Sequence, residues 1–123
     1  MNLEILPDTI AVCRLDAAAP IPTWARGDFV SITRMRDELS IVCAQLDAPR
    51  DVKCERDWRA LRVSGALDFA LVGILAALAT PLADAGISIF AISTFDTDHL
   101  LVKQNDFDRA IAILVQAGHA VKK

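Results

Sequence analysis

A short acidic segment in the C-terminal third of the chain holds the residue types best suited to bind a charged small molecule. Asp96 and Asp98 flank Thr97, and Ser93 and Thr94 precede them. Carboxylates bind an ammonium or a guanidinium group through charge-assisted hydrogen bonds, and hydroxyl groups add neutral donors and acceptors. The same residue types are also favoured in turns, where they bond to their own backbone. The segment therefore predicts either a ligand-binding loop or a tight turn that needs no ligand.

Metal binding and nucleophilic catalysis have weaker support. One histidine, His99, and two aspartates from a single turn make a poor cage for a metal ion. The cysteines are odd in number and form no Cys-x-x-Cys pair, and Cys13 and Cys43 lie in apolar runs, as buried small hydrophobes do. The third is Cys54. We therefore expect no metal, no cofactor and no enzymatic activity.

The composition excludes several other classes of protein. The 123 residues are 54% hydrophobic and 24% charged, so the chain has the apolar surface that a folded domain needs and a disordered chain lacks. The net charge of −3 and the absence of any long Lys/Arg run argue against a nucleic-acid partner. The start of the chain has no basic signal-peptide region, and charged residues, Pro81 and Gly86 interrupt the apolar stretch 66–93. These features predict a cytoplasmic protein without a membrane partner.

The first half of the chain reads as short strands. Residues 3–6 and 9–15 are rich in strand-forming residues, and Pro7-Asp8 between them predicts a turn. Residues 29–33 and 39–44 follow the strand pattern on either side of the polar turn Arg36-Asp37-Glu38, which predicts a hairpin. The polar stretch 45–57 is predicted to be a linker.

The second half predicts two helices within a set of strands. Apolar residues at helical spacing, beginning at Leu71 and ending at Leu82, predict the first helix, with Asp68 as its N-cap and Gly86 at its end. The same spacing from Phe107 to Leu114 predicts the second, with Asn105 or Asp106 as the cap and Gly118 as the stop. Strands are predicted at residues 58–64, 87–93, 100–103 and 120–121.

The order of elements from Trp58 onward is therefore βαββαβ. A weak internal repeat supports it, because Leu82-Ala83-Asp84-Ala85-Gly86 and Leu114-Val115-Gln116-Ala117-Gly118 each end a helix before a strand. This predicts an α+β, ferredoxin-like unit with two helices on one face of a four-stranded sheet. The open face and edges of that sheet need a cover, which the strands of residues 1–44 would supply as a second sheet or as an extension.

The residues of this half resemble an ACT domain. The resemblance rests on Gly73-Ile74-Leu75, on Gly86-Ile87-Ser88-Ile89-Phe90 and on the segment from Ile92 to Val102, of which Ser93-Thr94-Phe95-Asp96-Thr97-Asp98 is the most specific piece. More narrowly, the chain resembles the small ACT proteins related to CASTOR-type cytosolic arginine sensors, whose first half is matched by Glu38-Leu39-Ser40-Ile41-Val42. The resemblance implies a complete ACT domain at residues 58–123 and a degenerate, β-rich ACT-like subdomain at residues 1–57.

The resemblance also implies a non-catalytic regulatory or sensor protein that binds an amino acid or a similar small molecule between two ACT units. The chain is about half the length of those sensors, which favours a homodimer, and the regulatory role of the family implies a regulated protein partner. The implied pocket walls are three segments: Ser40, Ile41 and Val42; Val72, Gly73 and Ile74; and Ser93, Thr94, Phe95, Asp96, Thr97 and Asp98.

Two points stay open at the level of the sequence. Gly73 suits close backbone approach to a ligand and equally suits close helix–sheet packing. We also expect the start of the first helix and the 93–98 loop to lie at opposite ends of the sheet, which favours a pocket at an interface. The alternative function is a structural or assembly module that forms a constitutive homodimer or docks a partner enzyme without a physiological ligand.

Overall fold

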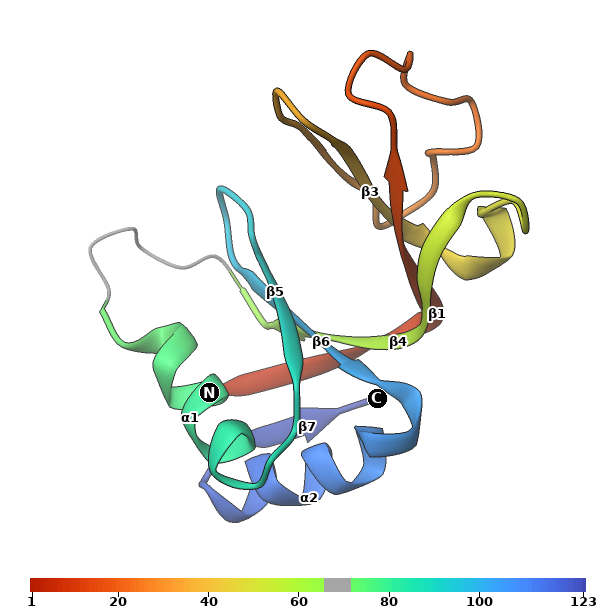
Figure 1. Cartoon of the computed structure of the whole chain (residues 1–123). Coiled ribbons are helices and arrows are strands. Elements are labelled where there is room, and N and C mark those ends of the chain that lie inside the picture. The colour runs from red at the N-terminus through yellow and green to blue at the C-terminus, as the bar shows by residue number, and fades with distance from the viewer. Residues whose placement is uncertain (66–71) are drawn as a thin grey trace. The chain divides into compact units, whose positions relative to one another are not determined.

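Figure 1 shows the computed structural model of the chain, which describes residues 1–65 and 72–123. The predicted cap Asp68 and the first predicted helical position, Leu71, lie outside these residues. The chain forms two compact units. The helical unit comprises residues 1–7 and 59–123, and the strand unit comprises residues 8–58. Two long strands, β1 (Asn2–Leu15) and β4 (Lys53–Val63), contribute residues to both units.

The helical unit contains the predicted βαββαβ order. It runs from β4 through α1 (Ile74–Asp84), β5 (Ile89–Ser93), β6 (Asp98–Lys103), the short 3₁₀ turn η2 (Gln104–Asp106) and α2 (Phe107–Gln116) to β7 (Ala120–Lys122). Its strand order is β7-β1-β4-β6-β5. In the simplest split βαβ arrangement the last strand would lie beside the first. Here the N-terminal residues of β1 lie between them, with β7 pairing in parallel to Asn2, Leu3 and Glu4.

Both helices bury their apolar side chains in one core. Leu78 and Leu82 of α1 and Phe107, Ala110 and Leu114 of α2 are buried, at the helical spacing that the sequence predicts. The strands contribute alternate residues to the same core because successive side chains of a strand point to opposite faces. These strand residues are Leu3, Leu61, Val63, Leu100 and Val102.

The two helices end in the same way, as the internal repeat predicts. Gly86 and Gly118 adopt the positive φ angles of 74° and 100° that favour glycine. At the end of α1, the N–H of Ile87 donates to the Leu82 carbonyl and the N–H of Gly86 donates to the Ala83 carbonyl. At the end of α2, the N–H of His119 donates to the Leu114 carbonyl and the N–H of Gly118 donates to the Val115 carbonyl. Each helix is therefore closed by a Schellman motif, which satisfies carbonyls left without intrahelical partners.

The strand unit contains the predicted hairpin. β2 (Ser31–Arg34) pairs antiparallel to β3 (Leu39–Ala44), and the N–H of Met35 donates to the Glu38 carbonyl across the turn at 2.8 Å. β3 also pairs antiparallel to β1, from Ile10 opposite Ala44 to Leu15 opposite Leu39. The core of this unit includes side chains from both strands: Ala11, Cys13, Leu39, Ile41, Cys43 and Ala48.

Two sequence predictions in this half are wrong. The predicted turn at Pro7-Asp8 does not form, because β1 continues through both residues. Pairing to β7 covers residues 2–4 and pairing to β3 covers residues 10–15, so Pro7 lies in the gap between these two ladders.

The predicted linker 45–57 instead contains a short 3₁₀ turn, η1 (Gln45–Asp47), and the first five residues of β4. Its polar residues alternate between exposed and half-buried positions, so a polar segment keeps the period of two that a strand requires.

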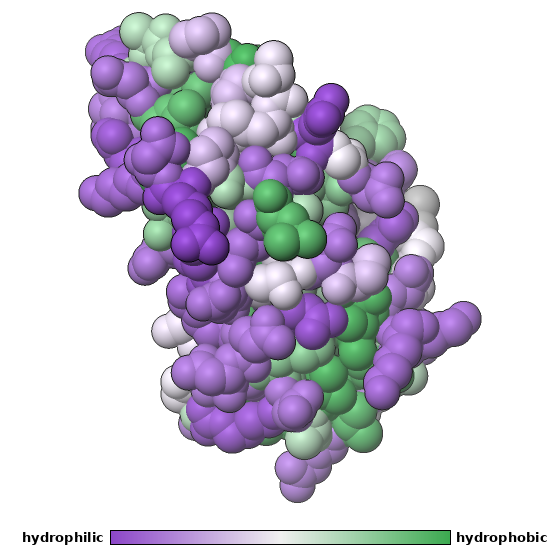
Figure 2. Space-filling view, turned by 90° about the vertical axis from the view of Figure 1, so that its right-hand side faces the viewer, coloured by the Kyte–Doolittle hydropathy of each residue, from purple (hydrophilic) through white to green (hydrophobic). Residues whose placement is uncertain are grey.

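The face of the molecule drawn in Figure 2 is predominantly hydrophilic. On the face drawn in Figure 2, hydrophobic residues occur in patches between hydrophilic ones. A few large apolar side chains are nevertheless well exposed, among them Leu46, Val72 and Phe95. Within the described ranges, no helix combines the length and the hydropathy needed to cross a membrane.

Candidate functional site

The acidic segment forms a tight turn that joins β5 to β6 in the helical unit. The Thr94 N–H and its hydroxyl both donate to the Thr97 carbonyl, at 2.8 and 3.1 Å, and the Thr97 N–H donates back to the Thr94 hydroxyl at 3.3 Å. The Ser93 hydroxyl donates to Asp98 Oδ1 at 2.6 Å. These bonds define the backbone of the turn, while Phe95 and Asp96 at its tip are exposed. The turn and the ligand-binding interpretations of this segment are therefore compatible.

A buried hydrogen bond ties this turn to the end of β4. The Thr97 side chain is buried, and its hydroxyl donates to the Val63 carbonyl at 2.9 Å. Val63 is the last residue of β4, and the chain passes from there toward α1. The expectation that the turn and the start of α1 lie at opposite ends of the sheet is therefore wrong. The strands before and after α1, β4 and β5, therefore both have their C-terminal ends on this side of the sheet.

The start of α1 provides the second predicted wall. Gly73 is the N-cap residue with a φ of 76°, and its carbonyl accepts the first helical bond from Ala77. A Cβ atom added at Gly73 would meet no atom within 4 Å. The positive φ angle therefore favours a glycine at this position, and close packing does not require one. Val72 before it is 90% exposed, and Ile74 begins the helix. Helix starts leave unpaired N–H groups that suit a carboxylate.

The third predicted wall lies in the strand unit. Ser40, Ile41 and Val42 are consecutive residues of β3, and their backbones pair with β1 on one side and β2 on the other. The Ile41 side chain lies in the core of the strand unit, Val42 is buried and Ser40 is half-buried. Ligand contact by this wall stays a prediction.

His99 and the cysteines show the chemistry of structural residues. Burial, reinforced by the nearby Arg62 cation, lowers the pKa of His99, which favours the neutral imidazole. Burial likewise raises the pKa values of Cys13 and Cys43, which keeps both as thiols. The Cys54 and Cys13 sulfur atoms lie 2.6 Å apart within the strand unit. Across the described part of the chain, no group of histidine, cysteine or carboxylate side chains is arranged to hold a metal ion.

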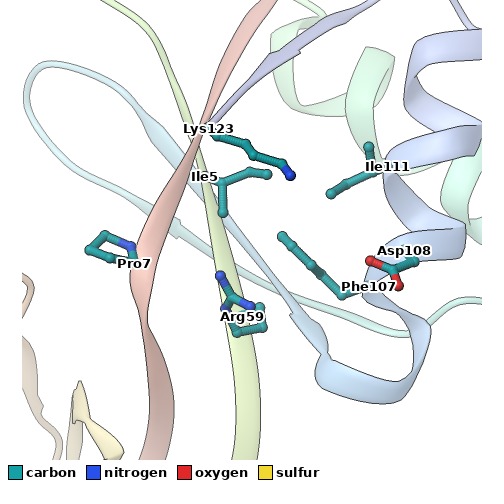
Figure 3. A pocket seen from close by; sticks show the side chains of 7 residues that line it. All are labelled: Ile5, Pro7, Arg59, Phe107, Asp108, Ile111 and Lys123. Atoms are coloured by element: carbon teal, nitrogen blue, oxygen red, sulfur yellow. The ribbon is translucent and has the colours of Figure 1, made fainter.

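The structure also contains a cavity that the sequence analysis does not predict. It has a volume of about 450 Å³ and lies in the helical unit between β1, β4, the first turns of α2 and the residue after β7 (Figure 3). Its lining combines apolar side chains with three charged ones: Ile5, Pro7, Arg59, Phe107, Asp108, Ile111 and Lys123. Arg59 within a strand and Phe107 at a helix start are visible in the sequence, but their proximity depends on strand order.

Comparison with known proteins gives the family. The sequence model for the ACT domain matches residues 53–116, and a model for an N-terminal domain matches residues 8–51. The human protein named cytosolic arginine sensor for mTORC1 subunit 1 is 34% identical over 110 residues, which cover 80% of this chain and 32% of that protein. The match thus spans about a third of the length of these curated relatives, so the expectation that the chain is about half their length is wrong.

Solved structures support the same conclusion about the fold. A crystal structure of a protein from Agobacterium tumefaciens has a TM-score of 0.93 and 43% sequence identity, covering 98% of this chain and 91% of that one. The regulatory subunit of aspartate kinase from Thermus flavus has a TM-score of 0.64 at 11% identity, covering 95% of this chain and 97% of that one, which shows similarity of fold alone. The family model matches residues 53–116, and the element order of this region, with two helices over one sheet, is that of the fold. The chain therefore belongs to the ACT domain family.

Proposed function

We propose that this protein is a non-catalytic regulatory domain that binds an amino acid, or a similar small molecule, and transmits the bound state to a protein partner. The proposal includes a complete ACT domain at residues 58–123 and a degenerate ACT-like subdomain at residues 1–57. The relatives named as arginine sensors support an amino-acid ligand. Their names also include the word cytosolic, and we propose the cytoplasm as the compartment.

One observation carries the proposal for the site. The Thr97 hydroxyl bonds to the end of β4, so the β5–β6 turn lies beside the end of the strand from which the chain leads to α1, which supports a site that uses both segments. The backbone of the turn is already fixed by Ser93, Thr94 and their partners, which leaves the exposed Asp96 available to a ligand. A preorganised loop binds with a smaller loss of conformational entropy than a loop that must order on binding.

The two ends of an amino acid suit this arrangement. Asp96 would accept hydrogen bonds from an ammonium or a guanidinium group. The backbone N–H groups of the first turn of α1, after Gly73, would receive the carboxylate. Ser40, Ile41 and Val42 would supply the third wall, and Phe95 and Val72 would cover the apolar part of the ligand. We propose that this wall comes from a second copy of the chain, in a homodimer. The ligand would favour one arrangement of the two copies because it binds that arrangement more tightly than the other.

The test is thermal unfolding against each of the twenty amino acids at millimolar concentration. A ligand at 100 times its Kd adds about 2.7 kcal/mol, which raises Tm by roughly 5–15 °C for a domain of this size. Asp96→Asn should abolish the shift without lowering the Tm of the ligand-free protein, because Asp96 is exposed and the bonds of the turn do not depend on it. Asp84→Asn is the matched control, since Asp84 is an exposed carboxylate at the far end of α1.

Light scattering with and without the stabilising amino acid tests the homodimer. We expect the molecular mass or the dimer dissociation constant to change on ligand addition. The proposal fails if no amino acid raises Tm. The proposed site fails if an amino acid binds Asp96→Asn as tightly as the wild type.

A further inference from the structure

The cavity of Figure 3 lies away from the proposed amino-acid site. Among the described residues that line it, Arg59 is the only one from β4, and it lies four residues before Val63, whose carbonyl bonds to the turn of the proposed site. Four residues of extended chain span roughly 13 Å, so the cavity and the proposed amino-acid site lie about that far apart along β4. None of the residues that line the cavity belongs to the β5–β6 turn or to the start of α1.

The cavity has an apolar wall on two sides. In Figure 3, the side chains of Ile5 from β1 and Ile111 from α2 point toward one another across the space, and the Phe107 ring lies below Ile111. Phe107 is 5% exposed, so its ring forms part of the core as well as part of the wall. Its volume of about 450 Å³ lies within the range of pockets that bind small molecules, and a branched aliphatic group fits its lining.

Arg59 is held in position at this wall. Its guanidinium carbon lies 4.8 Å from the centre of the Phe107 ring, a cation–π contact, and one terminal nitrogen donates to the Leu6 carbonyl at 3.3 Å. Its Nε is buried and has no hydrogen-bond partner among the residues that the structure describes. A buried donor without an acceptor is costly, and a guanidinium presents its donors in a fork that matches a carboxylate. Because the Nε atom is out of reach from solvent, an acceptor in the cavity would bind the terminal nitrogens of the guanidinium, which the contacts with Phe107 and Leu6 hold in place.

The charges around the cavity favour an anion. Figure 3 places the Lys123 ammonium on the side opposite Arg59, and Asp108 beside Phe107. The side chains of Arg59, Lys123 and Asp108 sum to a formal charge of +1. Between the described residues, none of these three side chains forms an ion pair with another.

We propose that this cavity is a second ligand site, which binds a small monocarboxylate with a branched aliphatic tail. The carboxylate binds the terminal nitrogens of Arg59, with Lys123 adding a second positive charge, and the tail packs between Ile5, Ile111 and Phe107. An amino acid such as leucine and the corresponding acid without an amino group share this chemistry. Asp108 distinguishes them, because only the amino acid carries an ammonium group that Asp108 can bind. The site does not depend on the amino-acid site proposed above.

The experiment is a titration of the isotope-labelled full chain, followed by two-dimensional amide NMR. The probes are 4-methylpentanoate, leucine and the uncharged 4-methyl-1-pentanol, each at millimolar concentration. We expect 4-methylpentanoate to shift the amide signals of Ile5, Arg59 and Ile111 while those of residues 93–98 stay in place. The alcohol should bind at least about tenfold more weakly, because it cannot form the charge-assisted hydrogen bonds.

Variants assign the binding to named side chains. Arg59→Met keeps an unbranched side chain against Phe107 and should weaken 4-methylpentanoate binding roughly 10- to 100-fold. Arg109→Met is the matched control, since Arg109 bonds to Asp106 and to the Ala85 carbonyl, away from the cavity. Lys123→Met should weaken binding by a smaller factor, about two- to fivefold, as expected for an exposed charge. If Asp108→Asn weakens the binding of leucine but not of 4-methylpentanoate, the site takes the amino acid. If leucine binds the wild type and Asp108→Asn equally well, the site takes the acid without an amino group.

Several results would overturn the proposal. They are equal affinity for the acid and the alcohol, unchanged affinity in Arg59→Met, or no signal shift with either acid for the folded protein. The comparison of acid with alcohol needs no variant, so it holds even if Arg59→Met fails to fold. Asp96→Asn should leave this binding unchanged, which separates the failure of this site from the failure of the site at the turn.

Discussion

The burial of one side chain, His99, makes the stability of the fold depend on pH. His99 faces its strand partner Ile92 across the β5–β6 pair and is 8% exposed. Its pKa is lowered, first by burial and then by the Arg62 cation, while Asp98 acts in the opposite direction. The same residue types that suggested a metal site in the sequence therefore form part of a packed hairpin. A neutral imidazole suits that place because a buried charge would need a dedicated partner.

The lowered pKa of His99 predicts a loss of stability in mild acid. The unfolded chain takes up a proton below the ordinary value of 6.5, and the native state does so only at lower pH. The unfolded state therefore binds more protons in that window, and the free energy of unfolding falls as pH decreases, by at most about 1.4 kcal/mol per pH unit. Urea unfolding at several pH values between 7 and 5 measures this slope.

His99→Gln serves as the comparison for this prediction, because glutamine keeps a polar side chain of similar length and does not titrate. Its free energy of unfolding should vary less with pH below 6.5 than that of the wild type, while both should change in parallel above pH 7. Identical slopes in the acid range would show that His99 does not set the pH dependence.

The elements of the helical unit owe their boundaries to local signals. Each helix ends at a glycine of positive φ, and each strand that follows begins within three residues of it. Asp106 occupies the N-cap position of α2 as the sequence predicts, but its side chain makes no capping bond and pairs with Arg109 at 3.3 Å instead. The helix ends are therefore specified more firmly than the helix starts.

Gly86→Ala tests the Schellman end of α1. The space around Gly86 is open, since an added Cβ would meet no atom within 4 Å, so the cost comes only from the φ of 74°. An L-residue in this region costs about 1–2 kcal/mol, and we expect the free energy of unfolding to fall by roughly 1 kcal/mol. Gly86→Asn should cost less, because asparagine tolerates the left-handed region better than alanine.

Chemical denaturation of the two variants measures the difference. Gly118→Ala should behave in the same way, since Gly118 closes α2 with the same pair of hydrogen bonds. A variant Gly86→Ala that is as stable as the wild type would show that the end of α1 does not need the left-handed conformation.

At the scale of the whole molecule, the first seven residues belong to the helical unit although the next fifty belong to the strand unit. Leu3 is 1% exposed and lies in the core with α1 and α2, and the backbone around it pairs with β7. The Asn2 carbonyl accepts from the Ser64 N–H at 2.8 Å, and the Met1 carbonyl accepts from Ala120 at 2.9 Å. The helical unit therefore needs both ends of the chain to complete its sheet.

Leu3→Ala should accordingly destabilise the helical unit. Deleting a fully buried leucine side chain costs about 2–5 kcal/mol through lost burial and the cavity left behind. Ile32→Ala is the matched control at an exposed position, because Ile32 is 38% exposed on β2 and should cost far less. Urea denaturation followed by circular dichroism measures both, and equal losses in the two variants would contradict the assignment of residues 1–7 to the helical core.

The sequence by itself determined the features that depend on neighbouring residues. The hairpin at residues 31–44, the two amphipathic helices, their glycine ends and the βαββαβ order all follow from periodicity and turn chemistry within short windows. Only the tertiary structure decided how distant segments meet. It inserted β1 between β4 and β7, tied the Thr97 hydroxyl to Val63, and brought Ile5, Arg59 and Ile111 around one cavity. Strand order depends on backbone pairing between residues far apart in the chain, which no local pattern encodes.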